Sequence, residues 1–138
     1  MKYLKKFPGK ALICCLLMIL SCWMTGCQTQ TDGQNSYQQI SADEAKEMMD
    51  TQSDYLILDV READEYQSGH IPGAVLFPVG SIDASSAEQI IPSKDTLLLV
   101  YCRSGNRSKT AASALAELGY TQVYEFGGIN DWPYDTVS

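Results

Sequence analysis

A cysteine followed by a short polar and basic loop is the part of this sequence best suited to chemistry. Cys102 ends the apolar run 97–102, and Arg103 and Arg107 follow within five residues. Such a run predicts a strand buried on both faces of a parallel sheet, and open α/β sheets place ligands at the carboxyl ends of their strands. Loop N–H groups and the two arginines would stabilise a thiolate over a thiol. We therefore predict that Cys102 is a nucleophile rather than a small core residue.

The loop after Cys102 has the composition of an anion-binding loop. Its residues are small or basic, and a helical pattern from Ser108 to Leu118 follows it. The amino end of a helix and neighbouring N–H groups bind anions. We expect Arg103 to face an entering anion, and Arg107 to orient that anion by forked hydrogen bonds. The candidate anion-binding residues of the loop are Arg103, Ser104, Gly105, Asn106, Arg107 and Ser108.

Other polar residues are expected to support this loop. Asp59 stands near the end of the apolar segment 55–60, and Arg61 follows it. We interpret Asp59 as a cap of the next helix and Arg61 as one half of a structural ion pair, with Arg61 also a candidate for the anion-binding cleft. His70 is the only histidine, and we interpret it as a structural turn residue that holds a backbone group. A thiolate stabilised by its loop needs no base.

Strand and helix patterns alternate along residues 37–138, and the Ser41–Glu44 pair has the spacing of a capping box. This alternation predicts an α/β domain with a mostly parallel sheet covered by helices on both faces. The glycine pair 127–128 predicts a turn. The predicted strands are 37–40, 55–60, 75–77, 97–102 and 122–125, and the predicted helices are 41–50, 62–67, a short irregular one within 81–91, and 108–118.

Residues 1–26 have the layout of a bacterial export signal. A lysine-rich start precedes the apolar run 11–20, which is too short to span a membrane comfortably. The segment Thr25-Gly26-Cys27 resembles the lipobox of bacterial lipoproteins, in which the cysteine is acylated and becomes the new amino terminus. Cys22, or a simple signal cut elsewhere, is the alternative. We therefore predict an exported lipoprotein that is anchored in membrane lipid through acylated Cys27 and faces the extracytoplasmic side.

The segment that follows Cys27 contains no apolar residue up to position 36, so residues 27–36 predict a flexible tether. The remaining residues, 37–138, are enough for one domain with a single core, and a monomer is the simplest state. Without the lysines of the signal, 6 basic residues face 17 acidic ones, a net charge near −11. This balance argues against a nucleic-acid partner and leaves a basic site suited to a small anion.

Cysteine usage narrows the chemistry further. The other four cysteines all lie within the first 27 residues, so Cys102 is the only thiol of the domain. Disulfides and cysteine-based metal sites are thereby excluded within one molecule, and we expect neither a metal nor a cofactor. A lone thiol in an exported protein is a liability unless it is used.

Four separated segments resemble the single-domain rhodaneses, and the resemblance covers residues 40–132. It implies a rhodanese-like α/β fold with a five-stranded, mostly parallel sheet. It also implies transfer of sulfur from a small anionic donor such as thiosulfate to a thiol or cyanide acceptor, through a persulfide on Cys102. Arg61 would then have room to line the anion pocket. The segments are 58–61 with 65–66, 69–74, 101–108, and 127–128 with Trp132.

Two other functions remain alternatives. Cysteine phosphatases and arsenate reductases also use a thiolate in an anion-binding loop, but they place five residues between the cysteine and the arginine. Four residues separate Cys102 from Arg107, which predicts a tighter ring suited to one sulfur. The second alternative is a persulfide carrier for a dedicated partner, or a rhodanese-like binding module at the membrane. Binding modules usually lack the cysteine, so retention of Cys102 favours transfer or carriage of sulfur.

Overall fold

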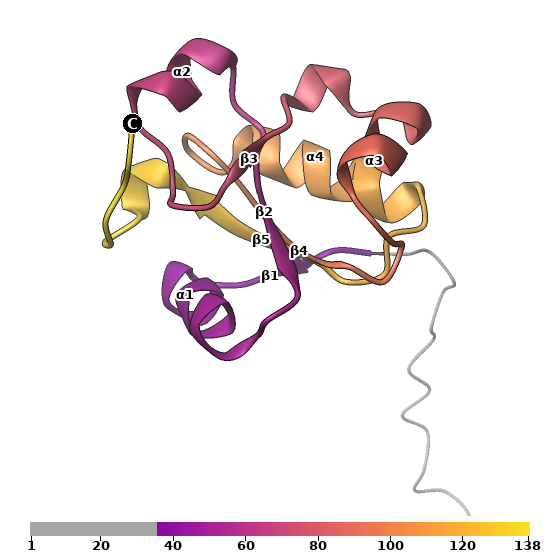
Figure 1. The fold of residues 1–138 in the computed structure, drawn as a ribbon, viewed down its shortest axis with the longest axis horizontal. Coiled ribbons are helices and arrows are strands. Elements are labelled where there is room, and N and C mark those ends of the chain that lie inside the picture. The colour runs from indigo at the N-terminus through magenta and orange to yellow at the C-terminus, as the bar shows by residue number, and fades with distance from the viewer. Residues whose placement is uncertain (1–35) are drawn as a thin grey trace, which may run out of the picture. The chain divides into compact units, whose positions relative to one another are not determined.

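The computed structural model describes residues 36–138. The predicted signal 1–26, the lipidation site Cys27 and the tether up to residue 35 lie outside the described residues. Five strands form one sheet, in which every pair of neighbours is parallel and the order is β1-β5-β4-β2-β3 (Figure 1). The strands are β1 (Gln38–Gln39), β2 (Tyr55–Asp59), β3 (Val75–Leu76), β4 (Leu97–Cys102) and β5 (Val123–Gly128).

Helices cover both faces of this sheet, so the predicted fold class is confirmed. Figure 1 shows α1 on one side and α3 and α4 on the other. The helices are α1 (Ala42–Thr51), α2 (Ala63–Ser68), α3 (Ala84–Ile90) and α4 (Asn106–Glu117), with 3-10 turns η1 (Val79–Ser81) and η2 (Ile129–Asp131). The predicted capping box of α1 is present, because Glu44 N–H donates to the Ser41 hydroxyl and the Ser41 N–H donates to the Glu44 carboxylate.

The core consists of two apolar layers with β4 between them. All six residues of β4 are buried, which confirms it as a strand covered on both faces. Alternate strand residues point to opposite faces, so one layer contains Val100 and the other Leu99. Leu115 of α4 packs into the first layer, and Ala45 of α1 packs into the second. This packing holds the carboxyl end of β4, and thus Cys102, in a fixed place.

Two boundaries near the loop differ from the prediction. Helix α4 begins at Asn106, two residues earlier than expected, because Gly105 acts as its N-cap with a positive φ of 96°. Only glycine adopts this backbone region without strain. The pair Gly127–Gly128 does not form the predicted turn, since both residues belong to β5.

Strand β5 carries a bulge where it passes the end of β4. Val100 pairs with Glu125, but Cys102 pairs with Gly128, so β5 has one extra residue over this stretch. Gly127, inside the bulge, has a φ of +91°. A bulge re-aims the side chains that follow it, and bulges are frequent beside functional sites. Here it directs the end of β5 toward the loop after Cys102.

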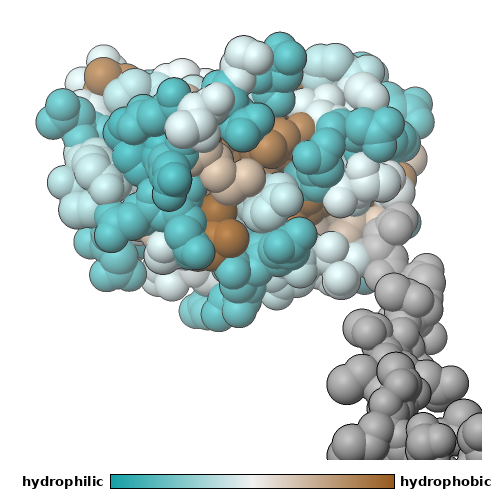
Figure 2. All heavy atoms as spheres, turned by 90° about the horizontal axis from the view of Figure 1, so that it is seen from below, coloured by the Kyte–Doolittle hydropathy of each residue, from teal (hydrophilic) through white to brown (hydrophobic). Residues whose placement is uncertain are grey.

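The surface seen from the side of α1 is mostly hydrophilic, with a few hydrophobic residues gathered near its middle (Figure 2). A groove of about 460 Å³ is lined by residues of α1, β2 and the C-terminal segment 132–135, and none of the residues 102–108 contributes to it. Within residues 36–138, no helix combines the length and the apolar character that crossing a membrane requires.

Candidate functional site

Cys102 lies at the last position of β4, and its side chain is buried, with 1% of the residue exposed. Its sulfur accepts a hydrogen bond from the Gly105 N–H at 3.1 Å and lies 3.5 Å from the Ser108 hydroxyl oxygen. Burial alone raises the pKa of the thiol. Hydrogen bonds from the Ser108 side chain and from the N–H groups of Ser108, Gly105 and Ser104 outweigh burial and lower the Cys102 pKa below its usual value. The geometry therefore favours a thiolate.

The loop around Cys102 is braced by the bulged end of β5. The Asn130 N–H donates to the Arg103 carbonyl at 3.2 Å. Gly128 approaches the same carbonyl so closely that a Cβ at this position would lie 2.2 Å from the Arg103 oxygen. Only glycine fits there, which explains the second glycine of the pair. The loop thus depends on a close backbone contact between two separate parts of the chain.

Ser108 lies in the first turn of α4 and is fully buried. Its hydroxyl donates to the Glu125 carboxylate at 2.6 Å, and the Cys102 sulfur is its neighbour on the other side. Glu125 is itself only 3% exposed, on β5. A chain of polar groups therefore runs from the sulfur through Ser108 to Glu125.

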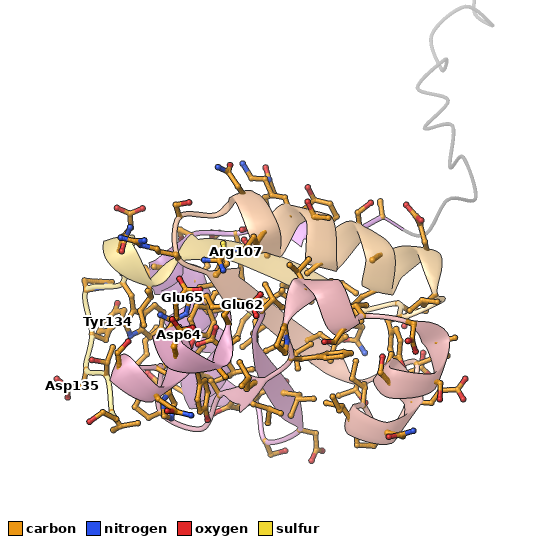
Figure 3. The ribbon with its side chains drawn as sticks, turned by 90° about the horizontal axis from the view of Figure 1, so that it is seen from above. Glu62, Asp64, Glu65, Arg107, Tyr134 and Asp135 are labelled. Carbon is orange, nitrogen blue, oxygen red and sulfur yellow. The ribbon has the colours of Figure 1, made fainter. Side chains whose placement is uncertain are left out.

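Arg107 does not point a free guanidinium into the loop. Its two terminal nitrogens donate to the two carboxylate oxygens of Glu65, at 2.7 and 2.8 Å. Figure 3 shows Arg107, on α4, reaching toward the acidic residues of α2. The sequence analysis expects Arg107 to orient an anion by forked hydrogen bonds, whereas in this structure both bonds go to Glu65. The hydrogen bonds to Glu65 raise the Arg107 pKa first, and the charges of Glu65 and Cys102 raise it further.

Three other loop residues, Arg103, Ser104 and Asn106, are exposed. Their side chains face solvent around a buried sulfur. Arg103 is therefore the loop cation best placed to meet an anion arriving from outside. The structure brings all seven residues from Cys102 to Ser108 into one strand end, loop and helix start, as the sequence predicts.

Asp59 and Arg61 form the structural ion pair expected of Arg61. The Arg61 guanidinium bonds the Asp59 carboxylate, at 2.6 Å for the shortest contact, and the Gly69 carbonyl at 2.7 Å. Asp59 does not cap α2, because the N-cap of that helix is Glu62; Asp59 accepts the Arg61 N–H instead. Arg61 is 5% exposed, and these contacts give no support to its placement in the anion pocket.

Tyr101 completes this buried cluster. Its hydroxyl donates to Asp59 and accepts the Ile71 N–H at 3.1 Å. Burial and then the bond to Asp59 raise the pKa of Tyr101, so its proton stays in place. Since Tyr101 immediately precedes Cys102, the cluster fixes the end of β4 from the face opposite to α4.

His70 has the structural role predicted for it. Its Nδ1 lies 2.9 Å from the Tyr66 carbonyl, and its ring stacks on the Tyr66 ring at a centroid distance of 3.8 Å. Its backbone exchanges hydrogen bonds with Val137 near the C-terminus. Nothing in these contacts connects the imidazole to the sulfur of Cys102.

Two residues of the site were not assigned a role from the sequence. Glu65 carried no signal beyond its place beside Tyr66. Glu125 did carry one: it stands two residues after Val123 in a strand, so alternation places both side chains on the same buried face. An acidic residue at an inward strand position is a sign of a buried polar role. Among the residues that the structure describes, no three His, Cys, Asp or Glu side chains are grouped to hold a metal ion.

Comparisons with known proteins agree with this geometry. The family model of the rhodanese-like domain matches residues 41–134. Thiosulfate sulfurtransferase PspE of Escherichia coli is 36% identical over 74 residues, covering 54% of this chain and 70% of PspE. Thiosulfate sulfurtransferase GlpE of Pseudoalteromonas translucida is 33% identical over 98 residues, covering 70% of this chain and 90% of GlpE.

A further relative is longer than the chain. YrkF of Bacillus subtilis, whose name describes a candidate sulfur carrier, is 32% identical over 108 residues, and the match spans 78% of this chain but 57% of YrkF. Among solved structures, the rhodanese-like domain of an Anabaena protein superimposes with a TM-score of 0.66 at 27% identity, covering 72% of this chain and 78% of that one. A rhodanese with anions from E. coli gives 0.55 at 32% identity, covering 61% and 98%. The sequence, the fold and the loop around Cys102 thus agree, and the chain belongs to the rhodanese-like family.

Proposed function

We propose that this chain is a sulfurtransferase that carries a sulfane sulfur on Cys102. The observation that supports it most is the position of the sulfur: a buried thiol with a lowered pKa, held by the Gly105 N–H at the carboxyl end of the central strand. A thiolate in such a ring of donors is a nucleophile toward sulfur. The thiosulfate sulfurtransferases among the relatives support the same class of reaction.

In the proposed reaction the Cys102 thiolate attacks the outer sulfur of thiosulfate. A Cys–S–S bond forms, the donor's S–S bond breaks, and sulfite leaves with the electron pair of that bond. The loop N–H groups then donate hydrogen bonds to the terminal sulfur of the resulting persulfide anion, as the donors of an oxyanion hole do to oxygen. Cyanide or a thiolate then attacks this terminal sulfur and releases the Cys102 thiolate. We assign to Arg103 the binding of the sulfonate group of the arriving thiosulfate, and to Arg107 the electrostatic stabilisation of the anionic sulfur.

Export and lipidation remain part of the proposal. They rest on the basic start, the apolar run and the segment Thr25-Gly26-Cys27 of the sequence. Labelling of expressing bacteria with a fatty-acid analogue tests them. We expect label on the unmodified chain and on Cys22→Ser, and none on Cys27→Ser. Label that is lost only in Cys22→Ser would move the anchor to that residue.

The test of the reaction is thiocyanate formation from thiosulfate and cyanide by the reduced full chain in detergent. The same sample, treated with thiosulfate alone, is digested with trypsin, and peptide 95–103, which contains Cys102, is weighed. We expect turnover and a mass gain of one sulfur on this peptide, both absent in Cys102→Ser. Glu88→Gln, which alters an exposed carboxylate with no contact to the loop, serves as the matched control.

Two other results would redirect the assignment. A mass gain without turnover would make the chain a sulfur carrier that requires its own partner. Absence of both from a reduced Cys102 would overturn the sulfurtransferase proposal. An aryl-phosphatase rate that disappears in Cys102→Ser would then favour the phosphatase alternative.

A further inference from the structure

Glu125 is a buried acid to which the sulfur-transfer steps assign no role. Its carboxylate accepts hydrogen bonds from the Ser108 hydroxyl at 2.6 Å, from the Gly127 N–H at 2.8 Å and from the Gln39 amide at 3.4 Å. All three donors are neutral. Within residues 36–138, no lysine, arginine or histidine forms an ion pair with it. A buried carboxylate without a cation depends on the hydrogen bonds that it accepts, and the shortest of these comes from Ser108.

Ser108 connects this acid to the nucleophile. Its hydroxyl has one proton, which is donated to the Glu125 carboxylate at 2.6 Å, with the Gly127 carbonyl at 3.3 Å a more distant acceptor, and the Cys102 thiol lies 3.5 Å from its oxygen as a donor. When the proton points to Glu125, the Ser108 oxygen can accept a proton from the thiol. When Cys102 is a thiolate, the hydroxyl stabilises it only by pointing the other way. The direction of the hydrogen bonds through Ser108 therefore depends on where the proton of Cys102 resides.

We propose that Ser108 and Glu125 relay the proton of Cys102, a step that rests on the sulfurtransferase function proposed above. The S–H bond of Cys102 breaks as an O–H bond forms on Ser108, while the original Ser108 O–H bond breaks and an O–H bond forms on Glu125. No proton leaves the site, and the single negative charge moves from Glu125 to the sulfur. Glu125 acts through Ser108, so it is a positioning residue and Cys102 remains the nucleophile.

The charged groups around Cys102, Ser108 and Glu125 favour this proton transfer. On α4 the Arg107 charge acts on Cys102, and its guanidinium is held away from Glu125 by its bonds to Glu65. On β1, which pairs with β5, the neighbour of Glu125 is the neutral Gln39. On β4 the ionisable groups at this end are Cys102 itself and Tyr101, whose side chain lies in the apolar layer on the other face of the sheet. The cation therefore stabilises the charge when it is on the sulfur, and Gly127 in the β5 bulge donates its N–H to the Glu125 carboxylate.

The inference predicts that the ionisation of Cys102 depends on the Glu125 carboxylate through Ser108. Coupled groups lose their protons in two steps that belong to the pair, and the thiolate is partly present between them. The reaction of Cys102 with iodoacetamide follows the thiolate. We would measure its rate against pH in the reduced full chain, on tryptic peptide 95–103 so that the other cysteines do not contribute. No sulfur donor is needed.

We expect two rises in rate with pH in the unmodified chain, and a single rise in Glu125→Gln. Ser108→Ala removes the hydrogen bonds that join the two groups, so the lower rise should lose about tenfold in amplitude, the equivalent of one charged hydrogen bond. Glu88→Gln should keep both rises. Circular dichroism establishes that each variant is folded, and Ser108→Ala keeps the test open should Glu125→Gln not fold.

A single rise in the unmodified chain would overturn the relay, and so would two rises that persist in Glu125→Gln. Because the measurement uses no thiosulfate, its result is separate from that of the sulfurtransferase test. Thiocyanate formation with a single rise would refute the relay alone. Two rises without any sulfur transfer would support the relay and refute the proposed reaction.

Discussion

Glu65 on α2 and Arg107 at the start of α4 are joined by two hydrogen bonds, one to each carboxylate oxygen. The pair connects residues 42 positions apart and ties α2 to the end of the loop that contains Cys102. The bond to Arg107 is the main cause that lowers the pKa of Glu65 from 4.5 to about 2. The two bonds to Glu65 also keep the Arg107 guanidinium from turning into the loop that contains Cys102.

Removal of this pair should have a measurable cost that depends on pH. We expect Glu65→Gln to lower the free energy of unfolding by about 1 kcal/mol at pH 7, the upper range for a partly exposed ion pair. Since the Glu65 pKa is lower in the folded chain, the pair's contribution is complete above about pH 4.5 and is lost as the pH falls toward about 2. Urea unfolding at about pH 7 and about pH 3 should therefore give a smaller difference at the lower pH. Glu88→Gln is the control, and an equal difference at both pH values would contradict the prediction.

Arg103 is the exposed cation of the loop and should act on the donor rather than on the fold. We expect Arg103→Ala to raise the KM for thiosulfate about three- to tenfold, the loss of one charged hydrogen bond at an exposed position, with little change in stability. Initial rates over a range of thiosulfate concentrations measure this effect. Lys46→Ala, on α1, removes a cation elsewhere and should leave KM unchanged. An unchanged KM in Arg103→Ala would refute the role given to this residue.

Gly128 should tolerate no side chain. A Cβ there would lie 2.2 Å from the Arg103 carbonyl oxygen, and this oxygen belongs to backbone that cannot move aside easily. We expect Gly128→Ala to lower the free energy of unfolding by about 2 kcal/mol, as overpacking does, and to slow alkylation of Cys102 by displacing its loop. Gly80→Ala is the matched control, because a Cβ at Gly80 meets nothing within 4 Å. Thermal unfolding of the two variants compares them, and equal stability would contradict the contact.

Two buried tyrosines should respond in opposite ways to loss of the hydroxyl. Tyr101→Phe leaves Asp59 and the Ile71 N–H without their buried partner, so we expect a loss of about 1–3 kcal/mol. The Tyr120 hydroxyl is buried and, in the part of the chain that the structure describes, has no hydrogen-bond partner. Tyr120→Phe should therefore be neutral or slightly stabilising. Urea unfolding of both variants tests the pair, and a larger loss in Tyr120→Phe than in Tyr101→Phe would be incompatible with these contacts.

Much of the fold could be predicted because its signals are local. The apolar run that ends at Cys102 indicated a central buried strand, and the structure buries all six of its residues. The Ser41–Glu44 spacing indicated the start of α1, and both bonds of the capping box are present. Signals of this kind depend on residues within one turn or one strand, so they survive in any tertiary setting.

The sequence pattern predicts the start of α4 two residues too late, because this boundary depends on the tertiary structure. The pattern of apolar residues begins after Ser108, whereas the helix begins where Gly105 takes a left-handed conformation and serves as its N-cap. The position of that glycine is determined by the loop's packing against the bulged end of β5. A helical pattern records which face is buried, but it does not record where the backbone first turns.

The sequence by itself indicated the candidate nucleophile, its loop and the succession of strands and helices along the chain, because each is encoded by neighbouring residues. Only the tertiary structure decided the partners of the charged and polar groups. Arg107 binds Glu65, and Ser108 binds Glu125, 17 residues away. These pairs depend on the packing of α4 against α2 and β5, which no local pattern specifies. Cys102 therefore receives its nearest hydrogen bond from its own loop, but the charged residues that surround this loop come from other elements of the fold.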